Sequence, residues 1–370
     1  MAIRKTAALV AGLAILTGAL AGCATQGTTP GGNASGGDKP LIGITMPTVS
    51  LERWNNDGAG LKAQLEEMGY QTQLDYADNK NELQIQQLEN QINAGAKVLV
   101  IASIDGKTLG PTLQKAADKG IKVVAYDRLI LENPNVDYYA TFDNYKVGEL
   151  QGTFIKDTLE LDSAAGPFNF EPFAGSPDDN NASLFFQGAW DVLKPFVDSG
   201  KLVINSETGK KAAGNWQDIG ILEWKSATAQ SEMENRLNSF YTDKKVNVVL
   251  SPNDSLALGI AQALETAGYA VGPDYPVLTG QDGDVANVKN ILAGKQSMTV
   301  WKDTRELAKR VATMVDQIVK GGDVEVNDTE SYDNGSKVVP SFLLDPQVVV
   351  KDEVQSKLVD SGFIKADDLK

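Results

Sequence analysis

The chain has 370 residues, a formal net charge of −15, one cysteine and no histidine. The acidic balance argues against nucleic-acid binding, which requires a footprint of lysine and arginine. The lack of histidine removes the commonest general base and transition-metal ligand, and a lone cysteine excludes an intrachain disulfide framework or a cysteine-based metal site.

The first 22 residues have the pattern of a secretory signal peptide. A basic start with Arg4 and Lys5 precedes an uncharged apolar run, which is too short for a membrane span of roughly 20 residues. The ending Leu20-Ala-Gly-Cys23 resembles the lipobox of bacterial lipoproteins, in which the cysteine is lipidated and becomes the first residue. We therefore expect a signal peptide over residues 1–22 and a lipid on Cys23. An ordinary signal peptide with an incidental cysteine is the alternative.

The segment after the cysteine is typical of a flexible tether. It is rich in glycine, threonine, serine and asparagine and has nothing to bury. We expect the lipidated cysteine and the tether to occupy residues 23–40. Signal, lipid and tether together predict a globular domain anchored to the outer face of a bacterial cell membrane, where a diacylated cysteine supplies the two acyl chains that stable anchoring needs.

From Leu41 onward, short apolar runs alternate with amphipathic segments, several of which end at glycine. In the first half, strands are predicted at 41–46, 72–76, 97–102, 122–126 and 138–142, and helices at 56–68, 82–94 and 109–119. In the second half, strands are predicted at 168–173, 202–205, 246–250, 276–279 and 298–301, and helices at 147–159, 182–193, 227–241, 256–267, 285–293 and 305–320. The alternation predicts an α/β fold with two doubly wound parallel-sheet lobes, and the length suggests about two domains.

Polar side chains follow the predicted strands, where ligands bind in open α/β sheets. They are Arg53 and Trp54 after the first strand and a loop, Asp127 with Arg128, the stretch G-S-P-D-D-N-N-A at 175–182, Asn253 with Asp254, Gln281 with Asp282, and Lys302. Charged and amide groups can satisfy the hydroxyls of a sugar, and a tryptophan face can stack on the C–H face of a pyranose. This mixture predicts a sugar site.

Several segments resemble the xylose-binding and multiple-sugar-binding periplasmic proteins of ABC importers, in the same order along the chain. They are I-A-S-I-D-G (101–106), K-V-V-A-Y-D-R-L (122–129), A-T-F-D-N (140–144), G-S-P-D-D-N-N-A (175–182), L-S-P-N-D (250–254), T-G-Q-D (279–282) and W-K-D-T-R-E-L-A (301–308). The resemblance implies a type I periplasmic-binding fold, in which two lobes joined by a hinge close on a monosaccharide. We expect an N-terminal lobe of residues 41–142 with 303–335, and a C-terminal lobe of residues 143–302 with 336–370.

Carried over position by position, the resemblance implies ten sugar contacts: Arg53, Trp54, Asp127, Arg128, Asp179, Asn181, Trp224, Asn253, Asp282 and Lys302. Trp224 is the expected second stacking aromatic, although its segment matches less closely. Residues 206–221 differ from the xylose-specific members, so xylose, glucose, galactose and arabinose all stay open. No cofactor and no metal are expected, and the expected partners of this monomer are an ABC importer permease and, through the lipid, the membrane.

Other residues have structural interpretations. Ser176 or Asp178 is expected to cap the helix that follows, while Asp179 and Asn181 face the cleft. Asp143 and Asn144 are expected in a hinge or turn. The tryptophans at 190 and 216 are interpreted as packing or loop residues.

The function that the resemblance implies is capture of an aldose outside the cell and its delivery to a permease. A sensor feeding a chemoreceptor or sensor kinase is the alternative, and a glycoside hydrolase using Asp127 and Asp282 is a further one. Arg128 and Lys302 are expected to lower the pKa of those carboxylates, which does not suit a general acid. A secretion signal argues against a transcription regulator. Without histidine, binding is expected to change little between about pH 5.5 and 8.

Overall fold

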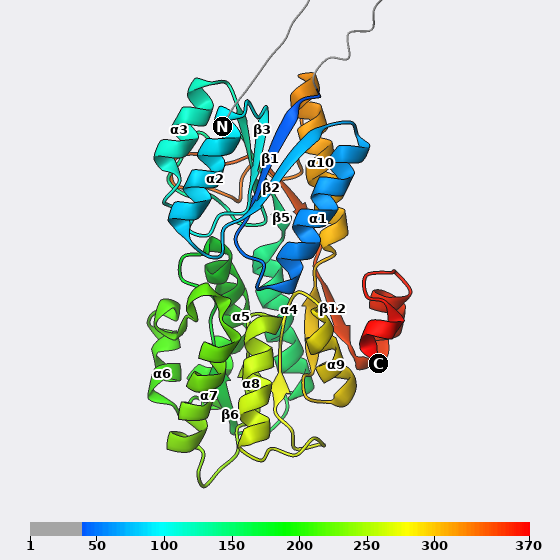
Figure 1. Cartoon of the computed structure of the whole chain (residues 1–370). Helices are drawn as coiled ribbons and strands as arrows, with labels where there is room; N and C mark the ends of the chain where they lie inside the picture. Colours follow the sequence, from blue (N-terminus) through cyan, green and yellow to red (C-terminus); the bar gives the residue numbers. More distant parts are fainter. Residues whose placement is uncertain (1–38) are drawn as a thin grey trace, which may run out of the picture. The chain divides into compact units, whose positions relative to one another are not determined.

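The computed structural model describes residues 39–370, so the expected signal peptide, Cys23 and most of the tether lie outside the described residues. None of the helices in the described part combines the length and apolar character that a membrane crossing needs. Two parallel sheets organise this part of the chain (Figure 1), which confirms the predicted fold class.

The first sheet has six parallel strands in the order β11-β5-β4-β3-β1-β2. The strands are β1 (Leu41–Met46), β2 (Gln71–Tyr76), β3 (Val98–Ile101), β4 (Lys122–Tyr126), β5 (Tyr138–Phe142) and β11 (Ser341–Leu344). The helices that cover it are α1 (Glu52–Glu67), α2 (Asn81–Asn93), α3 (Gly110–Asp118) and α10 (Thr304–Lys320). Along β4, Val124 packs with α1 and α10, while Val123 packs with α2 and α3. Both faces are therefore buried, as the continuous apolar runs predicted.

The second sheet has four parallel strands in the order β7-β6-β8-β9. They are β6 (Phe168–Pro172), β7 (Leu202–Val203), β8 (Val248–Leu250) and β9 (Val277–Leu278). Beside them, β10 (Met298–Trp301) pairs antiparallel with β12 (Gln347–Val350). The helices of this part are α4 (Asn144–Thr158), α5 (Asn180–Asp198), α6 (Glu207–Lys210), α7 (Ser226–Phe240), α8 (Asp254–Thr266) and α9 (Val285–Ala293).

The chain passes three times between the two parts, after β5, after β10 and after β11. The expected boundary at residue 336 is wrong in one respect. β11 falls in the segment expected in the C-terminal lobe, but Ser341–Leu344 pairs with Tyr139–Phe142 of the first sheet. The last crossing therefore follows Leu344. A four-residue strand has too little pattern to show which sheet it joins, because pairing with a distant strand decides this.

The helix starts differ most from the sequence predictions. α1 begins at Glu52 rather than at residue 56, so Arg53 and Trp54 lie in its first turn and not in a loop. α5 likewise begins at Asn180, before the predicted residue 182. When a helix start is predicted from the spacing of apolar residues, a polar first turn makes the predicted start too late. In α1 and α5 this polar first turn carries side chains that line the site.

Candidate functional site

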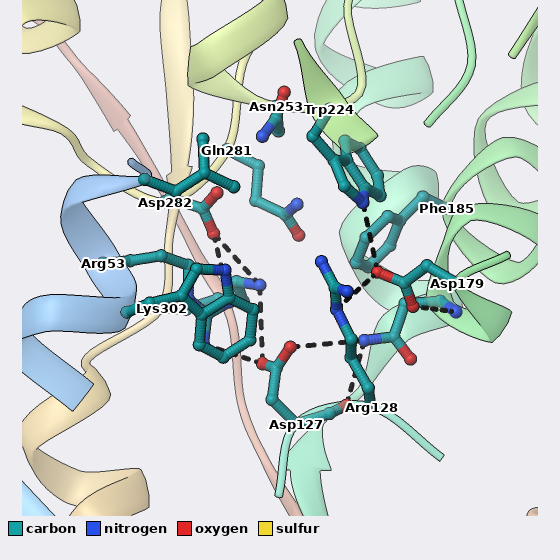
Figure 2. A pocket seen from close by; sticks show the side chains of 13 residues that line it. Arg53, Asp127, Arg128, Asp179, Phe185, Trp224, Asn253, Gln281, Asp282 and Lys302 are labelled. Carbon is teal, nitrogen blue, oxygen red and sulfur yellow. Dashed lines mark hydrogen bonds and ion pairs between the residues drawn. The ribbon is translucent and has the colours of Figure 1, made fainter. Parts of the chain in front are cut away.

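A cavity of about 300 Å³, counting its open mouth, lies where residues from both parts of the chain meet. Figure 2 shows its lining, with Arg53, Asp282 and Lys302 on one side and Asp179, Phe185 and Trp224 on the other. The ten residues expected to contact a sugar all line it, together with Leu51, Phe185 and Gln281. The structure thus brings the whole predicted set together.

Helix starts and strand ends position these side chains. Asp127 and Arg128 directly follow β4, as predicted from the buried strand. Asp179 is the N-cap of α5, where its side chain accepts a hydrogen bond from the backbone N–H of Asn181. Asn253 is the N-cap of α8 and bonds the N–H of Leu256 in the same way. The polar residues are therefore fixed by the elements that they begin or end.

Three cations and three carboxylates form a buried, charge-balanced network in the cavity wall. Asp127 Oδ2 accepts a hydrogen bond from Arg53 Nη2 at 2.9 Å and lies 3.9 Å from Lys302 Nζ. Lys302 Nζ lies 3.1 Å from Asp282 Oδ1, and Arg128 Nε lies 2.9 Å from Asp179 Oδ2. The last ion pair joins residues that follow strands of different sheets.

The electrostatics keep Asp127 ionised. Burial acts to raise the pKa of Asp127, but Arg53, Lys302 and Arg128 together hold it below its ordinary value, as expected. Burial acts to lower the pKa of Arg53, but nearby carboxylates raise it well above its ordinary value. Burial raises the pKa of Asp179 despite the opposing charge of Arg128. Asp127 is thus a permanent acceptor rather than a proton donor.

Two buried tryptophans provide flat apolar faces. The guanidinium carbon of Arg53 lies 4.3 Å from the ring centroid of Trp54, and that of Arg128 lies 5.1 Å from it. Trp224 packs edge-on against Phe185, with ring centroids 6.3 Å apart. Its indole Nε1 donates to Asp179 Oδ2 at 3.2 Å.

The stretch from Gly175 to Asp179 holds the second tryptophan. A Cβ atom at Gly175 would lie 1.9 Å from the ring of Trp224, so only glycine fits beneath it. Ser176 Oγ accepts from the backbone N–H of Glu223 at 2.8 Å, which ties the stretch to the turn carrying Trp224. The predicted cap was wrong: Asp179, and not Ser176 or Asp178, caps α5. Ser176 and Asp178 instead bond each other through their side chains.

Asn181 lines the cavity, but protein groups already occupy its amide. Its Nδ2 donates to the backbone oxygen of Asp127 at 2.9 Å. Its Oδ1 accepts from Asn144 Nδ2 at 3.0 Å and from Tyr139 Oη at 3.2 Å. We therefore interpret Asn181 as a support for Asp127, whereas the resemblance implied that it donates to a sugar hydroxyl.

Some polar atoms of the cavity lack a partner. Trp54 Nε1 and Gln281 Oε1 are buried, and neither has a hydrogen bond to any group within residues 39–370. Such an atom costs about 1–3 kcal/mol unless a partner reaches it. Both side chains line the cavity, where a bound molecule can supply a partner.

Strained backbone also gathers here. The backbone φ angles of Asp127, Trp224 and Asp282 are +60°, +55° and +105°. Residues other than glycine rarely adopt positive φ angles. The turn after Asp282 is fixed by Asp254, whose Oδ2 accepts from the N–H groups of Gly283 and Asp284 at 3.0 Å each. Residues held this way cluster at ligand sites, because the surrounding structure must enforce them.

Three lining residues were absent from the predicted set. Gln281 was among the polar residues selected after the predicted strands, beside Asp282, but it was not one of the ten expected contacts. Phe185 lies four residues after Asn181 on α5, so the two residues share one face of the helix. This helical spacing could have indicated that Phe185 lines the cavity too. Leu51 precedes α1 and carried no signal. The described residues contain no cluster of three or more His, Cys, Asp or Glu that could hold a metal ion.

Comparison with known proteins gives consistent matches. The model of a family described as periplasmic binding protein domain matches residues 42–323. The multiple sugar-binding periplasmic receptor ChvE of Rhizobium radiobacter is 51% identical over 334 residues, covering 90% of this chain and 93% of the receptor. The D-xylose-binding periplasmic protein of Escherichia coli (strain K12) is 36% identical over 328 residues, covering 89% and 92%.

A solved structure is also similar along nearly its whole length. It is an ABC transporter solute binding protein from Clostridium phytofermentans with bound β-D-glucose. It has a TM-score of 0.85 and 50% identity, and the match covers 89% of this chain and 100% of that chain. The fold and the family resemblance expected from the sequence are thereby confirmed.

Proposed function

The chain belongs to the periplasmic binding protein family, and on that premise we propose that it captures a monosaccharide in the cavity and delivers it to an ABC importer. The observation that carries the proposal is the cavity lining, which combines two tryptophan faces with a charge-balanced set of donors and acceptors. The similar proteins, whose names specify multiple sugars and D-xylose, and the structure with bound β-D-glucose support it.

The chemistry of the lining suits a sugar. Each hydroxyl donates one hydrogen bond and accepts two, so it pairs with Asp127 and Asp282 as acceptors and with Arg128 and Lys302 as donors. Trp54 and Trp224 contribute faces for the C–H groups of the ring. The proposed ligand is xylose or a related aldose such as glucose, galactose or arabinose.

Capture proceeds by closure of two lobes around the sugar. We assign one lobe to residues 41–142 with 303–344 and the other to residues 143–302 with 345–370. The three crossings of the chain form the hinge. The sugar shifts the equilibrium toward the closed form only because it binds that form better, through donors and acceptors from both lobes.

We also propose that the protein is an extracytoplasmic lipoprotein monomer whose Cys23 is lipidated and anchored in the cell membrane. The Leu20-Ala-Gly-Cys23 pattern supports this. Cys23→Ser is expected to move the protein from the membrane fraction to the released fraction of cells expressing it. An unchanged membrane fraction would contradict the anchor and leave sugar binding untouched.

A binding protein fits the site better than an enzyme does. A glycoside hydrolase needs a carboxylic acid that stays protonated, whereas cations hold the pKa of Asp127 below its ordinary value. Sensing through a chemoreceptor or sensor kinase would use the same cavity and the same closure. It differs from import only in the partner that reads the closed form.

Titration calorimetry with xylose, glucose, galactose, arabinose and ribose tests the proposal. At least one aldose is expected to bind at micromolar Kd or better, about −8 kcal/mol. Glu67→Ala, at an exposed position near the end of α1, is the matched control and should bind like the wild type. If no aldose binds more tightly than ~100 µM, the proposed function is wrong.

A further inference from the structure

Asp57 is a buried carboxylate that sits behind the cavity and does not line it. It lies on α1 four residues after Arg53, so both side chains project from the same face of the helix. Asp57 Oδ2 accepts from Arg53 Nε at 3.0 Å and from Arg53 Nη2 at 2.8 Å. Asp57 Oδ1 accepts from Tyr126 Oη at 2.8 Å. The carboxylate is fully buried, with both oxygens engaged.

These bonds decide how the guanidinium of Arg53 faces the cavity. The Nε and Nη2 groups are held from behind by Asp57, and Nη2 also donates to Asp127. The remaining Nη1 lies 3.5 Å from Asp282 Oδ1, on the ligand side. A planar guanidinium held along one edge has a fixed orientation, so its free nitrogen is aimed rather than mobile.

The partners of Arg53 differ in permanence. Asp282 follows a strand of the second sheet, and in the proposed mechanism it moves away when the lobes open. Asp57 is on the same helix as Arg53 and stays with it in every state. A donor that is already oriented before the sugar arrives avoids the entropic cost of ordering it on binding.

We propose that Asp57 is a positioning residue for sugar binding: it holds the guanidinium of Arg53 in the orientation that the ligand requires, in the open as well as the closed protein. This inference rests on the proposed function. Asp57 is not among the ten residues that were expected to contact the sugar.

Protonation of Asp57 is expected to make sugar binding depend on pH. Burial raises the pKa of Asp57 to about 6, against the opposing effect of Arg53, while the charge of Asp127 raises it further and the hydrogen bond from Tyr126 lowers it. Tyr76, on β2, is the other titratable group that interacts with it. When Asp57 takes up a proton it loses its charge, and the hold on Arg53 weakens. Affinity should therefore be full well above pH 6 and fall as the pH drops through about 6, which replaces the expectation of flat binding.

The experiment measures the Kd of the tightest-binding aldose of the panel by calorimetry from pH 5 to pH 8. The wild type is expected to lose affinity several-fold toward pH 5. Asp57→Asn is expected to bind the sugar roughly tenfold more weakly at pH 7.5, because the loss of one hydrogen bond between charged groups has an effect of about this size. Its affinity is not expected to fall toward pH 5. A merely structural residue would not remove the pH dependence.

Tyr126→Phe provides a second variant that keeps both Asp57 and Arg53. Because the hydrogen bond from Tyr126 lowers the pKa of Asp57, its removal should shift the fall in affinity to higher pH, with near wild-type binding at pH 8. If Asp57→Asn does not fold, this shift decides the matter. Wild-type binding by Asp57→Asn, or an unmoved pH profile in Tyr126→Phe, overturns the inference but leaves the proposed function intact. Absence of any aldose binding in the wild type overturns both.

Discussion

The two tryptophans that line the cavity are supported in different ways. Trp54 lies in the first turn of α1 and packs into the core of the first sheet, and its Nε1 has no partner in the described part of the chain. Trp224 lies on a short turn with left-handed backbone, and its Nε1 donates to Asp179. One face of the cavity is therefore held by a regular helix and the other by contacts with a distant segment.

The difference shows where the shape of the site can change. Moving Trp54 requires moving a helix that is part of the core. Trp224 also packs into an apolar core, but its backbone lies on a turn that contacts the stretch from Gly175 to Asp179 and that follows residues 206–221, so changes in these segments can shift it. The segment that departs from the xylose-specific pattern is thus next to the wall held by a loop. We infer that this wall, rather than the helical one, tunes which sugar fits.

The largest expected effect comes from removing the carboxylate of Asp127. This carboxylate lies close to both Arg53 and Lys302, so Asp127→Ala leaves two buried cations without a shared partner. We expect about 100-fold weaker sugar binding, near 3 kcal/mol, by calorimetry. Asp127→Asn keeps an acceptor oxygen and should lose less. A loss below threefold in the alanine variant would show that Asp127 does not contact the sugar or orient its donors.

Gly175→Ala should disturb the loop-held wall alone. The added Cβ would meet the Trp224 ring at 1.9 Å, so the indole must move. We expect affinity to fall by about 2 kcal/mol, in the range of a strained packing change, and the tryptophan fluorescence to change. Gly322→Ala is the matched control, because it lies outside both walls and its nearest contact would be 3.7 Å away. Unchanged binding in Gly175→Ala would mean that Trp224 is not a stacking surface.

Phenylalanine at each tryptophan position compares the two walls directly. Trp224→Phe loses the bond to Asp179, whereas Trp54→Phe loses no protein hydrogen bond. Trp224→Phe should therefore cost about 1 kcal/mol more sugar affinity than Trp54→Phe, measured side by side in one titration series. An equal loss would indicate instead that the sugar bonds Trp54 Nε1, because that variant would then lose a ligand contact of its own.

The sequence predicts the fold well because local patterns decide most of it. Buried strands such as β4 and β10 have the predicted bounds, and α9 does too. β11 was not predicted, because its pairing with β5 is a long-range choice that four residues cannot reveal. All ten expected site residues line one cavity, because the topology of parallel sheets fixes where their strand ends meet.

The supports of the site were harder to predict than its lining. The contact between Gly175 and Trp224 joins segments far apart in the sequence, so no local pattern contains it. Asp57 follows Arg53 at helical spacing, but a helix predicted to begin at residue 56 did not place the two on one face. Such residues contact the lining residues but do not line the cavity. A search for polar residues after predicted strands therefore does not identify them.

The smallest expected effect separates the support of Trp224 from its ring. Ser176→Ala removes both hydrogen bonds of the hydroxyl, one from the backbone N–H of Glu223 and one to the side chain of Asp178. It leaves the indole of Trp224 and its bond to Asp179 in place. We expect a two- to threefold loss of sugar affinity, about 0.5 kcal/mol, because the turn keeps its other contacts. Ser183→Ala, whose hydroxyl bonds only within α5, is the control and should not change binding. A loss as large as that of Gly175→Ala would mean that the turn, and not the fit of the ring against glycine, holds this wall.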